Sequence, residues 1–103
     1  MIIYNVTWQV APEIDENWLE WMQTHHIPKA LDTLYFEEVT ILKVGMDQPT
    51  DPTYAVQYKA SSRRHLQDYL DTEAALLKQE IHEKFGEQVL SFETQLELVS
   101  NQS

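Results

Sequence analysis

The chain begins with a regular alternation of apolar and polar side chains. Residues 2–10 place apolar side chains at every second position, Ile2, Tyr4, Val6, Trp8 and Val10, and polar ones between them, Asn5, Thr7 and Gln9. A period of two with one apolar face is typical of a strand that meets a core on one side and water or a polar cavity on the other. The pattern therefore predicts a strand over residues 2–10.

A helical period follows this strand. Pro12 and the acidic residues after it suit a first helical turn, where carboxylates complement the positive end of the helix dipole. One face then carries Ile14, Trp18, Trp21, Met22 and His25. Pro28 disfavours the helical conformation at residue 27, so we expect the first helical segment to end there, with a short turn over residues 28–31 after it.

The remaining elements follow from the same two periods. Residues 35–44 alternate as a second strand, and the turn residues from Gly45 to Pro52 predict a hairpin loop. A third strand is expected over residues 53–60. A second helix begins after the N-cap candidates Ser61 and Ser62, repeats apolar residues through Phe85, and stops at Gly86. The last strand covers residues 89–99.

The predicted order is β-α-β-β-α-β in one domain, residues 1–103. This is the ferredoxin-like arrangement of the α+β class, in which two helices cover one face of a four-stranded antiparallel sheet. If the aromatic face packs under the helices, polar residues line the uncovered face: Asn5, Thr7, Gln9, Gln57, Lys59, Glu93 and Gln95.

Charge and composition exclude several functions. The 103 residues carry a formal charge of −10, with seven basic residues and no basic patch, which argues against nucleic-acid binding and against anionic membrane surfaces. The chain has no cysteine, so a disulfide framework and a thiolate metal site are both excluded. The polar residues of the first strand interrupt any signal-peptide pattern, and we expect a cytoplasmic protein with no membrane span.

Several segments together resemble a small uncharacterised bacterial family, a domain of unknown function in the dimeric α/β-barrel superfamily. These segments are Ile2-Ile3-Tyr4-Asn5-Val6-Thr7, Trp18-Leu19-x-Trp21-Met22 with His26-Ile27-Pro28, Tyr54-Ala55-Val56-Gln57-Tyr58, and Lys84-Phe85-Gly86. The resemblance covers nearly the whole chain and implies a homodimer in which two sheets pack to form a barrel. It implies no activity.

More distant relatives in that superfamily include haem-degrading and antibiotic-biosynthesis monooxygenases, muconolactone isomerases and chlorite dismutases. Asn5, Trp18 and His26 are residue types that a monooxygenase of this kind uses. The catalytic sets of these relatives differ from one another, so fold-level analogy assigns none of them to this chain.

His26 is the leading candidate for chemistry. A histidine beside tryptophans can carry protons, ligate haem or stack as a cation, whereas the simpler interpretation is that it packs against the helix end. Adjacent His25 and His26 diverge by about 100° around a helix, so they cannot readily chelate one ion. The spacing of His65 and His82 on the second helix suits no shared ion either, and we predict no metal site.

The leading hypothesis is a protein that binds a small organic molecule in a pocket between the sheet and the first helix. We expect this pocket to be lined by Asn5, Trp8, Trp18, Trp21, His26 and Gln57. One alternative is an enzyme, a monooxygenase or isomerase that uses His26 as acid, base or haem ligand, although we predict no cofactor. The other is a structural or partner-binding module without a ligand.

Overall fold

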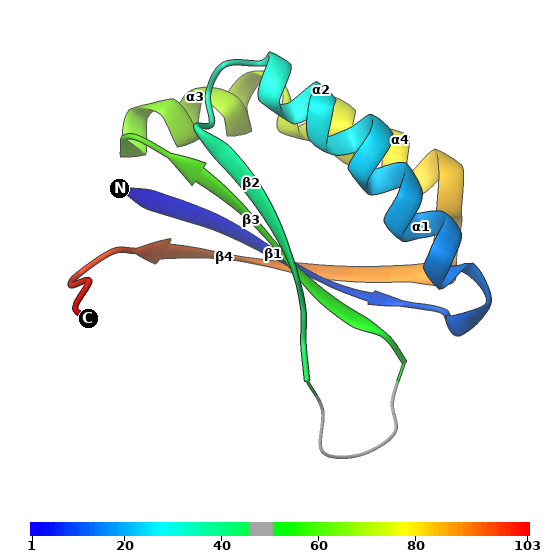
Figure 1. The fold of residues 1–103 in the computed structure, drawn as a ribbon. Coiled ribbons are helices and arrows are strands. Elements are labelled where there is room, and N and C mark those ends of the chain that lie inside the picture. Colours follow the sequence, from blue (N-terminus) through cyan, green and yellow to red (C-terminus); the bar gives the residue numbers. More distant parts are fainter. Residues whose placement is uncertain (46–50) are drawn as a thin grey trace.

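A four-stranded antiparallel sheet with helices on one of its faces forms the fold (Figure 1). The computed structural model describes residues 1–45 and 51–103, so residues 46–50 of the predicted hairpin loop lie outside the described residues. The strands are β1 (Ile2–Val10), β2 (Glu38–Lys43), β3 (Thr53–Ala60) and β4 (Val89–Glu97). The longer helices are α1 (Asp15–Trp21), α2 (Ile27–Asp32), α3 (Arg63–Thr72) and α4 (Ala74–Phe85). Short 3₁₀ turns η1 (Pro12–Ile14) and η3 (Gly86–Gln88) and a π-helical turn η2 (Met22–His26) complete the order.

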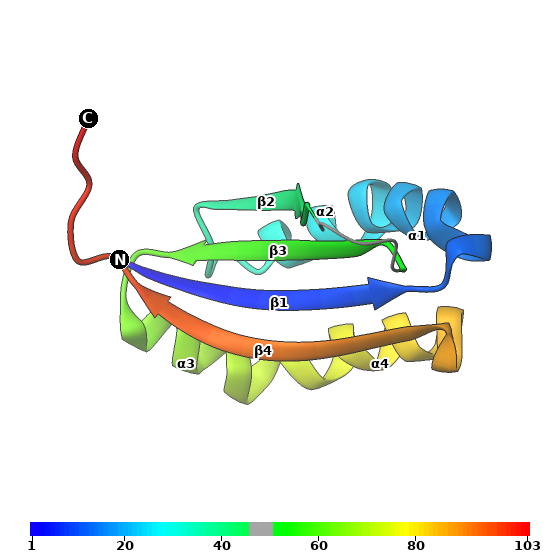
Figure 2. The same cartoon turned by 90° about the horizontal axis from the view of Figure 1, so that it is seen from below.

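The sheet has the strand order β2-β3-β1-β4 and confirms the predicted α+β class and β-α-β-β-α-β order. Two helical arms lie above the sheet, and Figure 2 shows the opposite face uncovered. The arm α1–η2–α2 lies on the β2 side, and the arm α3–α4 lies on the β4 side. The pocket described below depends on the space between this second arm and the sheet.

The two central strands follow the predicted alternation. β1 pairs with β3 so that Tyr4 faces Tyr58 and Val6 faces Val56, and all four are buried under the helices. β2 is shorter than predicted, because Phe36 precedes the strand and is buried in the core instead of continuing the ladder. Alternation therefore located these three strands and identified the core face of the central two.

The face of β4 that was predicted to be uncovered points toward the helices. Its register pairs Glu93 with Val6 and Gln95 with Tyr4, so both polar residues lie on the helix-covered face, and the prediction that they line the uncovered face is wrong. Alternation alone does not say which face of a strand meets the core, because that choice is made by the register with its neighbour. The other five predicted residues do lie on the uncovered face. Three apolar residues of β4 join them there: Leu90, Phe92 and Leu96.

The first helical arm continues past the point where Pro28 was expected to end it. Ile27 keeps helical dihedrals, and its N–H donates to the carbonyl of Met22, five residues back, which is the bond of a π turn. A wider turn accommodates a proline that lacks an N–H and would crowd the carbonyl four residues before it. The π turn ends at His26 and directs that side chain into the core, where it is 3% exposed.

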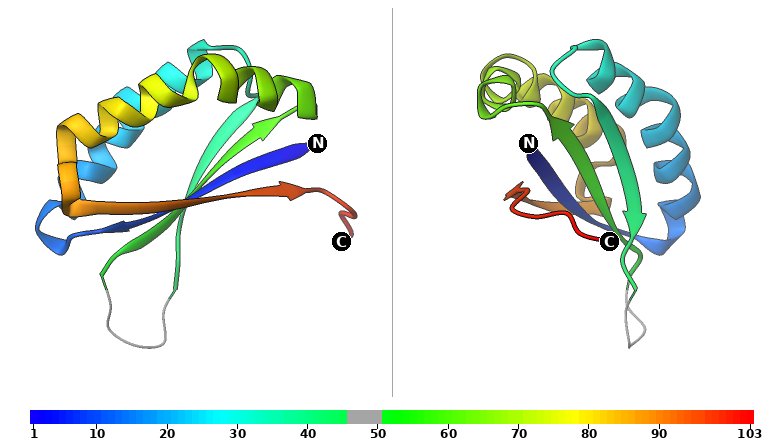
Figure 3. Two further views of the ribbon diagram at one scale, coloured as in Figure 1. Left: turned by 180° about the vertical axis from the view of Figure 1, so that it is seen from behind. Right: turned by 60° about the vertical axis from the view of Figure 1, so that its left-hand side comes forward.

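The second helical arm bends at Glu73, where one continuous helix was predicted. The Thr72 hydroxyl donates to the carbonyl of Asp68, four residues back, at 2.6 Å, and this type of back-bonding often bends helices. The bend is visible in the left view of Figure 3, where the arm arches over the sheet. The predicted ends of the arm are confirmed: Ser62 accepts from the N–H of His65, and Gly86 has a φ of +59°.

Aromatic side chains form much of the core between the two layers. Trp18 is fully buried against Trp8 and Tyr54, at ring-centroid distances of 6.0 and 5.1 Å. Tyr58 and Tyr69 pack nearby with Phe36 between them. Among the described residues, no helix has the length and apolar character needed to cross a membrane.

Candidate functional site

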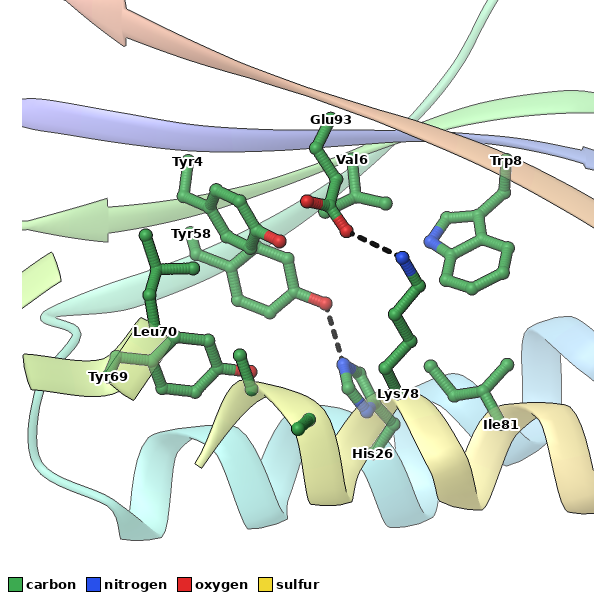
Figure 4. A pocket seen from close by; sticks show the side chains of 12 residues that line it. Tyr4, Val6, Trp8, His26, Tyr58, Tyr69, Leu70, Lys78, Ile81 and Glu93 are labelled. Carbon is green, nitrogen blue, oxygen red and sulfur yellow. Dashed lines mark hydrogen bonds and ion pairs between the residues drawn. The ribbon is translucent and has the colours of Figure 1, made fainter. Parts of the chain in front are cut away.

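A pocket of about 220 Å³ lies between the sheet and the α3–α4 arm (Figure 4). Its floor comes from β1 and β3, its roof from the two sides of the bend in the arm, and one side from β4. The predicted location of a ligand pocket was between the sheet and the first helix, and to the pocket described here the first helical arm contributes His26 alone. The lining residues are Tyr4, Val6, Trp8, His26, Tyr58, Tyr69, Leu70, Ala74, Ala75, Lys78, Ile81 and Glu93.

The space exists because of the residues that flank the bend. Ala74 and Ala75 follow Glu73 directly and present only methyl groups to the pocket, whereas Tyr69 and Leu70 lie on the α3 side. At the bend the arm lies farther from the sheet, and the two small alanine side chains leave the space between arm and sheet open. A larger residue at either alanine would occupy that space.

His26 and Tyr58 form a polar pair at the inner end of the pocket. His26 Nε2 and Tyr58 Oη share a hydrogen bond of 2.6 Å, and the tautomer of the imidazole decides which group donates. Burial lowers the pKa of His26 to about 4, against a smaller opposite effect of Glu80. Burial also raises the pKa of Tyr58 well above its ordinary value. Both side chains are therefore uncharged at neutral pH.

Trp8 brings an unused hydrogen-bond donor to the pocket. Its side chain is 2% exposed, and its indole Nε1 has no hydrogen-bond partner among the described residues. Figure 4 shows this nitrogen on the edge of the ring that faces the pocket. The great majority of buried polar groups in folded proteins have a partner, so an unpaired donor on a residue that lines a pocket is an unusual feature.

An ion pair crosses the outer side of the pocket. Lys78 Nζ on α4 donates to Glu93 Oε1 on β4 at 3.0 Å, and Figure 4 shows the two side chains meeting in front of the aromatic floor. Glu93 is close enough to raise the pKa of Tyr4 further, in addition to the larger effect of burial. The corrected face of β4 is what brings this carboxylate to the pocket.

The structure brings together two of the six predicted site residues. Trp8 and His26 both line the pocket. Trp18 lies behind Trp8 in the core, and Trp21 is half-buried outside the pocket, packed against His25 and His26. The last two, Asn5 and Gln57, pair with each other on the uncovered face of the sheet, where Asn5 donates to the hydroxyls of Thr7 and Thr94.

His25 points to the outer surface and takes no part in the pocket. Its Nε2 lies 3.3 Å from Glu80 Oε2, and Lys29 Nζ donates to the other oxygen of Glu80 at 2.7 Å, which links the two helical arms. Within the described residues, 1–45 and 51–103, no group of three or more His, Asp and Glu side chains converges as metal ligands would.

Ten of the twelve lining residues were absent from the predicted site, and Tyr4, Tyr69, Lys78 and Glu93 illustrate why. Tyr4 could have been found from the sequence, because it shares the buried face of β1 with Trp8. Tyr69 is close to it in space, at a ring-centroid distance of 6.2 Å, but belongs to the second helical arm. Lys78 and Glu93 meet only through the packing of α4 beside β4, for which the sequence carries no local signal.

Comparison with known proteins gives a fold and a family. The crystal structure of an ethyl tert-butyl ether D (EthD) family protein from Bacillus halodurans C-125 is similar, with a TM-score of 0.72 and 14% identity. The match covers 96% of this chain and 100% of the other, and at that identity it shows the fold alone. None of the curated proteins matches this sequence. Residues 1–99 match the model of the family described as "Domain of unknown function (DUF4286)", and the chain belongs to that family.

Proposed function

We propose that this protein binds a compact organic molecule in the pocket between the sheet and the α3–α4 arm. The observation that carries the proposal is a mainly apolar cavity, with aromatic and aliphatic walls, on which a few polar groups converge: the His26 and Tyr58 pair and the free donor of Trp8. Ligand sites have this composition, mostly apolar with a small number of placed polar groups. The volume of about 220 Å³ lies below the roughly 300–1,000 Å³ of most such sites, which favours a small ligand.

Binding is better supported than acid–base catalysis by His26. A general base works best with a pKa near the operating pH, and burial holds the pKa of His26 at about 4. Its Nε2 is also engaged by Tyr58. An isomerase or monooxygenase role for His26 would require a substrate that displaces this hydroxyl and raises the basicity of the ring.

Haem ligation by His26 is the weaker alternative for the same geometric reason. A haem iron needs the lone pair of one imidazole nitrogen, and Nε2 lies 2.6 Å from Tyr58 Oη in a pocket of about 220 Å³. A Soret band that forms on adding haem and is lost in His26→Ala would reverse this order of preference.

Native mass spectrometry of protein purified gently from its own cells tests the binding proposal. We expect a stoichiometric small-molecule mass on the wild type. Ala75→Trp, which fills the mouth of the pocket, should lose that mass, whereas Leu76→Trp, the next residue along α4 and outside the pocket, should retain it. A mass that survives in Ala75→Trp, or no bound mass on the wild type, would count against the proposal.

We further propose that the uncovered sheet face joins two copies of the chain. Leu90, Phe92, Leu96 and Leu42 keep between 43% and 66% of their surface exposed on this face, and large exposed apolar patches mark interaction sites. The ionisable residues that the four described strands place there are Lys59 and Glu38, which pair at 3.0 Å. Each chain carries a net charge of −10, but the acidic residue that the described strands place on this face, Glu38, is paired. Two such faces can therefore meet in a symmetric dimer without bringing unpaired acidic side chains of these strands into contact.

A matched pair of substitutions tests this homodimer. Leu90 and Leu76 have similar exposure, 66% and 62%, but lie on the uncovered sheet face and on α4 respectively. By sedimentation analysis we expect Leu90→Glu to be a monomer and Leu76→Glu to remain a dimer. A wild-type monomer at micromolar concentration, or a dimer unaffected by Leu90→Glu, would contradict the proposal.

A further inference from the structure

We propose that the ligand of this pocket is an uncharged aromatic molecule with a hydrogen-bond acceptor, such as an aryl ketone, whose oxygen accepts the hydrogen bond of Trp8 Nε1. This inference rests on the proposed function and names the chemical class of its ligand. Three features of the pocket carry it: the free donor, the neutrality of its lining, and its aromatic walls.

The free donor requires an acceptor. An indole N–H can only donate, so the group that satisfies Trp8 Nε1 must carry a lone pair, as a carbonyl, ether or hydroxyl oxygen does. Trp18 Nε1 also lacks a partner in the described part of the chain, but Trp18 is fully buried and does not line the pocket. Trp8 combines an unsatisfied buried donor with a place in the lining of the cavity of about 220 Å³.

The charges around the pocket favour a neutral molecule. Lys78 and Glu93, the charged residues of the lining, already neutralise each other at 3.0 Å. His26 and Tyr58 are both uncharged at neutral pH. A charged ligand would have to separate the ion pair or remain buried without a counter-ion, which is costly, and an anion would also meet the field of a chain with a net charge of −10.

The walls favour a flat ring. Tyr4, Tyr58 and Tyr69 surround one side of the pocket at mutual ring-centroid distances between 5.5 and 6.4 Å. Trp8 lies on the other side, held by Trp18 at a centroid distance of 6.0 Å. Aromatic pairs at centroid separations of about 4.5–7 Å attract one another beyond simple area burial, so a ring inserted here gains contacts on several sides.

Three probes of similar shape test the proposal: acetophenone, ethylbenzene and benzoate. They offer a neutral acceptor, no acceptor and an anionic acceptor respectively. Affinities are measured by NMR titration of wild type, Trp8→Phe and Trp21→Phe. Trp21 is the control because it is an aromatic residue of the same type outside the pocket. For each variant, the Kd of ethylbenzene is divided by the Kd of acetophenone. A change in pocket shape affects both probes and so largely cancels in this ratio.

In the wild type we expect acetophenone to bind about fivefold more tightly than ethylbenzene, the factor that about 1 kcal/mol of net hydrogen-bond energy gives. Trp8→Phe should bring the ratio close to one, and Trp21→Phe should leave it unchanged. Independently of any variant, acetophenone should shift the indole N–H resonance of Trp8 downfield and leave those of Trp18 and Trp21 in place.

The possible failures separate the two proposals. Equal binding of acetophenone and ethylbenzene, both blocked by Ala75→Trp, would overturn the ligand class and leave the binding function standing. A fivefold ratio that persists in Trp8→Phe would overturn the role of Nε1. Benzoate binding more tightly than acetophenone would overturn the neutral class. If none of the three probes binds the wild type, the ligand class fails; the binding function then fails with it only if native mass spectrometry also finds no bound mass.

Discussion

Burial of a neutral His26 should make the protein less stable in mild acid. The imidazole has a pKa of about 4 in the folded chain and about 6.5 when it is unfolded and solvated. Between these two values the unfolded state binds more protons than the folded state, so the free energy of unfolding falls as the pH decreases. The stabilisation is complete above about pH 6.5 and is lost progressively as the pH approaches 4.

The size of the effect follows from the two pKa values. One pH unit inside this window corresponds to about 1.4 kcal/mol, so lowering the pH from 7.5 to 4.5 should remove between about 2 and 3 kcal/mol. The titratable groups that act on His26 are Glu80, which raises its pKa, and His25, which lowers it. The pKa of Glu80 is itself lowered, chiefly by the hydrogen bond from Lys29, so Glu80 stays ionised across the window.

The assay is urea unfolding at pH 7.5, 6.5, 5.5 and 4.5, at one protein concentration so that any self-association affects every pH equally. His26→Gln keeps a polar group for Tyr58 but does not titrate. His82→Gln is the control, because His82 is exposed on α4. The free energy of unfolding of wild type minus that of His26→Gln should decline by about 2–3 kcal/mol toward pH 4.5. The same difference taken with His82→Gln should change by less than about 1 kcal/mol.

Two results would refute this reasoning. A flat difference between wild type and His26→Gln would show that His26 binds a proton as readily in the folded state as in the unfolded state. An imidazole titration of His26 near pH 6.5 in NMR spectra of the folded protein would show the same directly.

Three further substitutions test the local structure by the same unfolding assay. Tyr58→Phe should cost about 1–3 kcal/mol by leaving a ring nitrogen of His26 buried without its partner, and a cost below about 0.5 kcal/mol would contradict the hydrogen bond at 2.6 Å. Gly86→Ala should cost about 1–3 kcal/mol of unfolding free energy, because the φ of Gly86 is +59°. The control Gly45→Ala should change it by no more than about 0.5 kcal/mol. Equal costs for the two substitutions would contradict this account. Ser62→Ala should cost about 1 kcal/mol through loss of the N-cap, because the Ser62 hydroxyl accepts from the N–H of His65. Ser61→Ala should cost clearly less. The reverse order of costs would place the cap at Ser61.

Local patterns in the sequence were sufficient for the order of elements and for most of the core. Side-chain direction repeats every two residues in a strand and every 3.6 in a helix, so alternation in β1 and β3 identified both the strands and their buried faces. The ends of the second helical arm could also be predicted, because each depends on one residue: the N-cap Ser62 and Gly86 with its positive φ.

The tertiary structure decided which face of β4 meets the helices, and with it the character of both sheet faces. The alternation of β4 is equally regular in either orientation, and only its register with β1 directs Glu93 inward and Phe92 outward. The same limit applies to the helical arms. A sequence-local rule ended the first arm at Pro28, whereas the folded chain continues it through a π turn that turns His26 into the core.

The sequence by itself therefore determined the fold class, the aromatic core and two residues of the pocket lining, Trp8 and His26. The tertiary structure alone decided the pocket, because its components are far apart in the chain: a donor from β1, a hydroxyl from β3, a bend between α3 and α4, and an ion pair from α4 to β4. Periodicity describes the direction of side chains within one element. The distance between side chains of different elements depends on packing and register, which exist only once the chain has folded.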